Sequence, residues 1–122
     1  MNKSNSYKEL LVWQKSVDLV SEIYELTEKF PKSEVYGLVS QMQRAAVAIP
    51  SNIAEGQRRN YKKEFLQFLY VSYGSGAELE TQIEICKRLP RLKDLDYTGV
   101  ESNLEIIMKM LNALIRTLKN SL

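Results

Sequence analysis

Apolar residues recur at helical spacing along most of this 122-residue chain, and the clearest series lies near its C-terminus. Aliphatic residues follow one another there at alternating steps of four and three: Val100, Leu104, Ile107, Leu111, Leu114 and Leu118. This spacing places them on one face of an α-helix and is typical of a helix that packs against other helices. We therefore predict a helix over about residues 96–120, with its apolar face in a bundle core.

Three earlier segments show the same period, and we predict helices over about residues 7–30, 34–58 and 61–89. Ser6 and Glu9 form a capping-box pattern before the first helix. Pro50 lies inside the second helix, where its missing N–H donor predicts a kink. Asn60 is a candidate N-cap for the third helix, which Pro90 ends.

Short connectors and the absence of β-hairpin patterns define the predicted fold class. Four amphipathic helices joined in this way predict an all-α protein, an antiparallel up-and-down four-helix bundle. A chain of 122 residues suits one core, so we expect a single domain over residues 1–122. With 44% hydrophobic and 26% charged residues, the composition is typical of a globular protein.

Charge and cysteine content limit the kinds of binding site and the cellular location to be expected for the chain. A net charge of +2 excludes a uniformly basic surface, so any site for nucleic acid must arise from local segregation of charge. Cys86 is the one cysteine, which excludes an intramolecular disulfide and favours a reducing, cytoplasmic location. No apolar run approaches the length of a bilayer span, and the N-terminal residues lack a signal-peptide pattern. We expect no membrane association.

The residue types that common catalytic and metal sites need are missing. The chain has no histidine, which removes serine and cysteine catalysis of the usual kind and most zinc and di-iron sites. It has no glycine-rich phosphate loop either; Gly74-Ser75-Gly76 instead favours close approach of two helices. Cys86 lies on an apolar stripe and is interpreted as a small buried residue. We predict no catalytic residue, metal or cofactor; an enzyme would have to use Arg44, Glu55 and Glu78.

A polar stripe on the second helix is its most unusual feature. Its members follow at steps of three and four and share one face: Gln41, Arg44, Ala48, Asn52, Glu55 and Arg59. Such a stripe is either the exposed side of a helix or a hydrogen-bonded contact with a neighbouring helix or subunit. We select Gln41, Asn52 and Glu55 as candidate contact residues, together with Glu78 on the third helix.

Two clusters of basic residues flank the third helix. The first contains Arg58, Arg59, Lys62 and Lys63, and the second contains Lys87, Arg88, Arg91 and Lys93. Repeated around the axis of an oligomer, a cluster of this kind would hold a phosphate backbone without reading its sequence. In an isolated subunit the same residues are equally well explained as solvated helix ends. The first cluster and Arg44 are our candidate nucleic-acid-binding residues.

Several short motifs together resemble the bacterial four-helix-bundle proteins encoded in intervening sequences of 23S ribosomal RNA genes. The main ones are Gln41-Met42-Gln43-Arg44-Ala45-Ala46 and Ile49-Pro50-Ser51-Asn52-Ile53-Ala54-Glu55-Gly56. Others are Leu11-Val12-Trp13-Gln14, Arg59, Phe65, Leu69, Gly74-Ser75 and Glu78-Leu79. The chain departs from the family pattern at Ala48, where a serine is expected, and at Gln57, where an aromatic residue is common.

The resemblance implies a function of binding and assembly. The family is related to the accessory protein of diversity-generating retroelements, a homopentamer that binds nucleic acid and partners a reverse transcriptase. By this analogy we expect a non-enzymatic homo-oligomeric scaffold, a pentamer, that binds RNA and a protein such as a reverse transcriptase. The alternative is a protein-interaction adaptor that uses its apolar and aromatic surface and binds no nucleic acid.

Overall fold

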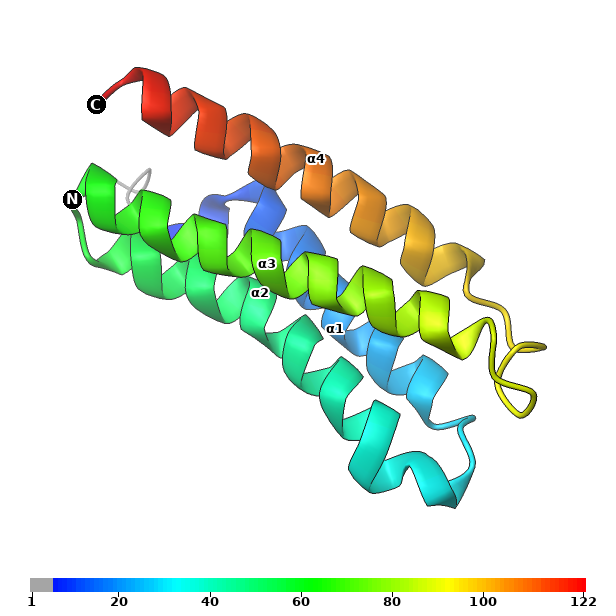
Figure 1. Cartoon of the computed structure of the whole chain (residues 1–122). Helices are drawn as coiled ribbons and strands as arrows, with labels where there is room; N and C mark the ends of the chain where they lie inside the picture. The colour runs from blue at the N-terminus through cyan, green and yellow to red at the C-terminus, as the bar shows by residue number, and fades with distance from the viewer. Residues whose placement is uncertain (1–5) are drawn as a thin grey trace.

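The computed structural model describes residues 6–122 and shows four long helices packed side by side (Figure 1). They are α1 (Leu11–Thr27), α2 (Ser40–Arg58), α3 (Lys62–Cys86) and α4 (Thr98–Asn120). Three shorter turns complete the fold: η2 (Tyr7–Glu9) precedes α1, and η3 (Lys32–Glu34) and η4 (Val35–Val39) connect α1 to α2. Residues 6–122 contain no strand, so the predicted all-α fold is confirmed. The first five residues of the predicted domain lie outside the described part.

Each helix packs against the helices that precede and follow it in the chain. Contacts join α1 to α2, α2 to α3 and α3 to α4, and α4 closes the bundle against α1. The start of α1, the α2–α3 turn and the end of α4 therefore lie at the same end (Figure 1). This is the up-and-down four-helix bundle that the helical spacing predicted.

The core runs along the axis of the bundle and contains the predicted apolar faces. Its fully buried side chains come from all four helices: Leu19, Ile23, Met42, Ile49, Ile53, Leu69, Leu79, Ile83, Leu104, Ile107 and Leu111. In α4 the last two seam residues, Leu114 and Leu118, are only half-buried, whereas Ile115 is buried. The reason is that a straight α-helix drifts relative to a strict seven-residue repeat.

Two glycines allow close approach between neighbouring helices. A Cβ atom on Gly56 would lie 2.6 Å from the Phe68 Cβ, so α2 and α3 pack in direct contact there. A Cβ on Gly76 would meet the sulfur of the Met108 side chain on α4, so Gly76 makes room for this side chain. The close approach of two helices at Gly74-Ser75-Gly76 stays a prediction. Gly74 has open space around it. Gly56 is thus a packing residue inside α2.

The ends of the helices differ from the predicted ones for local reasons. Leu10 is extended, with ψ 124°, so α1 begins at Leu11, and the Ser6 hydroxyl accepts the Lys8 N–H of the preceding 3₁₀ turn. Gly37, inside η4, departs from helical geometry, with φ −106° and ψ −110°, so the chain bends there before α2 begins at Ser40. Asn60 has a φ of 68° and ends α2, so its predicted role as N-cap of α3 is wrong.

Pro50 is buried and lies inside α2, which continues through it as a helix. The missing donor of Pro50 does not end α2, and the predicted kink at this residue is not confirmed. None of the helices formed by residues 6–122 is long and apolar enough to cross a bilayer.

Candidate interaction groove and basic end of the bundle

The first half of α2 and the second half of α3 enclose a shallow groove, the α2/α3 groove, of about 350 Å³. Its lining residues are Gln41, Arg44, Ala45, Ala48, Glu78 and Gln82. The fold thus brings Gln41 and Arg44 of the predicted polar stripe together with Glu78, which was predicted from the third helix. The small side chains of Ala45 and Ala48 leave room for another surface to approach the helix backbone.

The polar groups of this groove lack partners within the described part of the chain. Arg44 and Glu78 are exposed, and neither forms an ion pair there at 4.0 Å or less. The Gln82 side chain is 6% exposed, and its Oε1 atom is buried without a hydrogen bond. Gln82 was not among the residues predicted from the sequence. Its available signal was a polar residue next to the buried positions Leu79, Ile83 and Cys86 on α3.

Asn52 and Glu55 lie beyond the groove on α2 and bond within their own chain. The Asn52 amide donates to the Ala48 carbonyl oxygen at 2.8 Å, one turn earlier in the same helix. The Glu55 carboxylate pairs with Arg59 at 3.2 Å, also one turn away. The four predicted contact residues therefore fall into two pairs. Gln41 and Glu78 line the groove. Asn52 and Glu55 instead bond to residues one turn away along α2.

The α2–α3 turn carries the first basic cluster. The Arg58 guanidinium lies 5.2 Å from the centre of the Tyr7 ring, which is a cation–π contact with the N-terminal turn. Arg59 pairs with Glu55 at 3.2 Å and Glu64 at 3.4 Å. Lys62 and Lys63 are exposed at the start of α3. Arg59 thus joins α2 to α3, while the two lysines face solvent.

The antiparallel topology adds further basic residues to this end (Figure 1). We define the basic end by its cationic side chains, all exposed: Lys8, Arg58, Arg59, Lys62, Lys63, Arg116 and Lys119. Glu9, Glu55 and Glu64 are the carboxylate side chains of the same segments. Arg44 lies apart, since 14 residues of α2 separate it from Arg58, or roughly 21 Å. The five predicted nucleic-acid-binding residues therefore do not form one surface.

The second basic cluster, at the opposite end, is largely neutralised. Lys87 pairs with Glu101 at 2.7 Å and with Glu84 at 3.8 Å, and the hydrogen bond to Glu101 raises the pKa of Lys87. Arg88 also pairs with Glu84, at 3.5 Å. Arg91 donates to the Ser33 hydroxyl at 3.4 Å. The positive charge of this cluster is therefore balanced locally.

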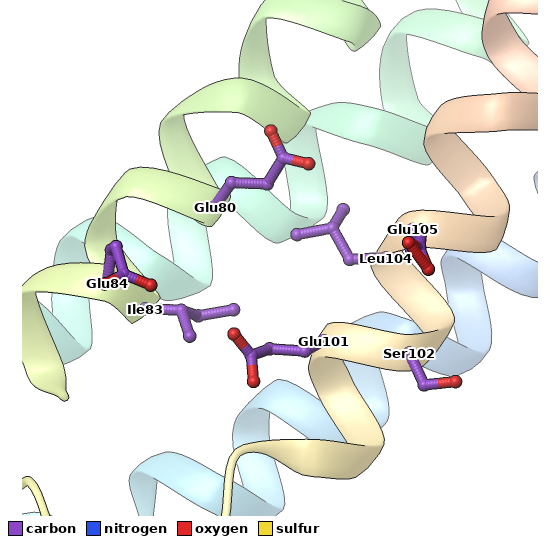
Figure 2. Close-up of a pocket in the computed structure, with 7 residues that line it drawn as sticks. All are labelled: Glu80, Ile83, Glu84, Glu101, Ser102, Leu104 and Glu105. Carbon is purple, nitrogen blue, oxygen red and sulfur yellow. The ribbon is translucent and has the colours of Figure 1, made fainter.

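An acidic groove separates α3 from α4 next to this cluster (Figure 2). It encloses about 440 Å³ and is lined by Glu80, Ile83, Glu84, Glu101, Ser102, Leu104 and Glu105. In this view Ile83 lies between Glu84 and Glu101, and the Glu80 carboxylate lies farther along α3 on the side of Leu104. Glu84 and Glu101 pair with Lys87 or Arg88, whereas Glu80 and Glu105 form no ion pair within residues 6–122, so the groove keeps a negative charge that would repel phosphate groups.

Cys86 lies in the core next to α4. Its thiol is fully buried, 3.7 Å from the Met42 sulfur, and burial raises its pKa. The Tyr97 hydroxyl donates to the Leu92 carbonyl oxygen at 2.7 Å, and burial also raises the Tyr97 pKa. Both shifts disfavour the ionised forms, so the interpretation of Cys86 as a small buried residue is confirmed.

Residues 8–113 match a family model described as 23S rRNA-intervening sequence protein. The chain belongs to this family. The resemblance read from the sequence motifs is therefore confirmed, and the 23S rRNA-intervening sequence match covers α1, α2, α3 and most of α4. It does not establish the further relation to diversity-generating retroelements. A search of curated proteins finds no match.

The α2/α3 groove and most of the basic end belong to the part matched by the 23S rRNA-intervening sequence family. The α2/α3 groove lies wholly within residues 8–113, as do Arg58, Arg59, Lys62 and Lys63. Arg116 and Lys119 of the basic end lie beyond the match. Among residues 6–122, no group of three or more histidine, cysteine, aspartate or glutamate side chains is arranged to hold a metal ion.

Proposed function

We propose that this chain is a non-enzymatic scaffold of the cytoplasm that assembles with copies of itself, as a pentamer, and binds RNA through its basic end. The observation that carries the RNA part is the composition of that end. Seven exposed cationic side chains from four segments face only three carboxylates, and two of these are held by Arg59. Phosphate contacts from lysine and arginine supply most of the affinity of non-specific nucleic-acid binding.

The start of α3 strengthens this proposal. Tyr61 precedes the helix without a side-chain cap, so backbone N–H groups of the first turn stay available. Lys62 and Lys63 occupy the same turn, where the helix dipole disfavours positive charge. A phosphate group placed there would accept hydrogen bonds from the free N–H groups, and its negative charge would offset the repulsion between the helix dipole and the lysines.

The non-enzymatic part is supported by the geometry of the polar residues. Arg44 and Glu78 line the α2/α3 groove, but Glu55 is bonded to Arg59 elsewhere on α2. The three polar residues that an enzyme would have to use, Arg44, Glu55 and Glu78, therefore do not line one groove. The absence of histidine from the chain points the same way.

The experiment compares RNA binding of two triple variants with the same net charge. The basic-end variant changes Arg58, Lys62 and Lys63 to Glu, and the control changes Lys29, Lys32 and Lys93 to Glu at the opposite end. Binding of an unstructured RNA is measured by fluorescence anisotropy over a salt series. We expect at least a tenfold loss for the basic-end variant and little change for the control. Equal binding by both variants would refute the proposed RNA surface.

A protein-interaction adaptor is the second candidate function, and the exposed apolar residues favour it. Val17 and Tyr24 on α1, Val47 on α2 and Val71 on α3 are exposed. Such residues on neighbouring faces are typical of a surface that binds another protein, a reverse transcriptase being one example. Capture of a partner that survives nuclease treatment, and is lost when Tyr24 and Val47 are changed to Ser, would favour the adaptor.

A further inference from the structure

Tyr61 carries an uncovered aromatic ring at the basic end. The residue lies just before α3 in extended geometry, with φ −125° and ψ 131°, and it is 68% exposed. Its carbonyl oxygen accepts the Phe65 N–H at 2.9 Å, so its backbone is anchored to the first turn of α3. Tyr7 and Trp13, at the same end, pack edge to face with their ring centres 5.3 Å apart. Tyr61 has no such contact among residues 6–122, and its ring faces solvent.

Three cations without an ion pair flank this ring in the chain. Arg58, Lys62 and Lys63 lie within three positions of Tyr61, and none of them pairs with a carboxylate at 4.0 Å or less within residues 6–122. Arg58 is held against the Tyr7 ring, 5.2 Å from its centre, a contact that positions the guanidinium but leaves its charge uncompensated. A lone exposed tyrosine is ordinary on a protein surface, so it is this setting that points to a ligand.

The charges beside Tyr61 favour a polyanion over a protein surface as the ligand. The nearest carboxylates in the chain, Glu55 and Glu64, are both bound by Arg59, at 3.2 and 3.4 Å, and do not compensate the other cations. A protein that covered Tyr61 would remove unpaired cations from water, and charged residues are depleted at the centre of protein interfaces for this reason. A nucleotide with an unpaired base instead combines a flat aromatic face with adjacent negative charge.

We propose that the basic end binds single-stranded RNA, with the Tyr61 ring stacked on one unpaired base and with Arg58, Lys62 and Lys63 contacting the phosphates beside it. The inference rests on the proposed RNA-binding function and names the form of RNA that this end binds. Every base has a π-face, so stacking on tyrosine does not depend on sequence. Inside a duplex both faces of a base are covered by its neighbours, so only an unpaired stretch or a strand end offers a face to Tyr61.

The two kinds of contact respond differently to salt. Phosphate contacts release counterions, so the affinity that comes from Arg58, Lys62 and Lys63 falls as the salt concentration rises. Stacking of Tyr61 on a base releases no counterion, so it adds affinity without changing the slope of log affinity against log salt. Loss of the ring should therefore lower the affinity by the same factor at every salt concentration. Loss of a cation should change the slope as well.

The test compares three RNA ligands of equal length: an unstructured single strand, the same strand with its bases removed, and a duplex. The variants are Tyr61→Leu, which removes the ring, Tyr61→Phe, which keeps it, and Tyr36→Leu as the control. Tyr36 is 97% exposed and lies in η4, at the opposite end of the bundle. Binding is measured by fluorescence anisotropy at several salt concentrations. Thermal unfolding and sedimentation velocity compare the folding and the oligomeric state of the variants.

The expected result is a loss that depends on both the ring and the bases. Wild type should bind the strand that carries bases about tenfold more tightly than the abasic strand, and Tyr61→Leu should lose this preference with an unchanged salt slope. The affinity of Tyr61→Leu for the abasic strand and for the duplex should equal that of wild type. Tyr61→Phe and Tyr36→Leu should bind all three ligands like wild type.

Four other results would overturn the stacking role of Tyr61. Equal binding of the base-carrying and abasic strands by wild type would do so, although the phosphate-binding surface would stand. An equal loss by Tyr61→Phe and Tyr61→Leu would assign the effect to the hydroxyl group. A loss by Tyr61→Leu on all three ligands, together with altered sedimentation, would place Tyr61 in a contact between subunits. Wild type that binds none of the ligands would refute the proposed RNA surface together with this inference.

Discussion

Ser72 donates a hydrogen bond from its hydroxyl to the carbonyl oxygen of Ile49, at 2.9 Å, across the interface between α3 and α2. Both residues are fully buried. The accepting carbonyl directly precedes Pro50, where α2 lacks one backbone donor. Together with Gly56, which brings α2 against Phe68, this bond fixes how the two helices of the groove lie against each other.

Replacing Ser72 with Ala should destabilise the fold by about 1 kcal/mol, the usual net value of one hydrogen bond. Thr81→Ala is the matched control, since the Thr81 hydroxyl is exposed and bonds to Ala77 within its own helix. Urea unfolding of both variants measures the difference. Equal midpoints for the two would show that the Ser72 bond contributes nothing to packing.

Two glycine substitutions, one at a buried position of α2 and one at an exposed position of α3, should have opposite effects on stability. Gly56→Ala places a Cβ 2.6 Å from the Phe68 Cβ, so the helices must separate, and we expect a loss of about 1–3 kcal/mol. Gly74→Ala has open space and exchanges the poorer helix former for the best one, which predicts a gain of up to about 1 kcal/mol. Thermal unfolding of the two variants distinguishes them, and a stable Gly56→Ala protein would contradict the close approach.

Periodicity predicted the number, order and packing of the helices because each apolar face repeats over many turns. The helix ends depend on the backbone angles of single residues, and these angles are harder to predict from the sequence. Leu10 is extended before α1, and Asn60 adopts a positive φ that ends α2. Asparagine is common both as an N-cap and in the left-handed region, so its type alone did not separate the two roles.

The sequence predicted several residues of the candidate site, but it predicted less well how they lie relative to one another. The three- and four-residue steps placed Gln41 and Arg44 on one side of α2, and the structure adds Glu78 from α3 to the same groove. Gln82 could not be recognised, because its lack of a hydrogen-bond partner depends on every side chain around it. Arg116 and Lys119 lie at the same end of the bundle as the α2–α3 turn because α4 runs antiparallel to α3, which only the topology of the whole bundle shows.

Asp96 should make the start of α4 sensitive to acid. Its carboxylate accepts the backbone N–H of Thr98 at 3.0 Å, and this bond lowers the pKa of Asp96 from its ordinary value of 3.8. The ionised form is therefore favoured by folding, and its contribution is complete above the ordinary value and is lost as the pH falls through the folded-state value. We expect Asp96→Asn to lower the unfolding temperature at pH 7 but not at pH 2. An equal difference at both pH values would contradict this origin.

Cys86 should resist alkylation in the folded protein. Its thiol is fully buried and its pKa is raised, so both access and the thiolate fraction are reduced at neutral pH. Treatment with iodoacetamide at pH 8, followed by mass spectrometry, should leave the native chain unmodified and label it fully in denaturant. Rapid labelling without denaturant would show that α3 opens readily near its C-terminal end.

The residues of the basic end should contribute unequally to RNA binding. Lys62 and Lys63 are exposed and have no ion pair within residues 6–122, whereas Arg59 is held by Glu55 and Glu64. A cation that contacts phosphate releases counterions, so each lost contact reduces the slope of log affinity against log salt by roughly 0.7 for a single strand. Changing Lys62 and Lys63 to Gln together should therefore lower this slope by about 1.4, and Arg59→Gln should change it much less. The slopes come from anisotropy titrations at several salt concentrations. A larger effect from Arg59 than from the lysine pair would mean that RNA displaces the Glu55 and Glu64 ion pairs, and that the α2–α3 turn rearranges when it binds.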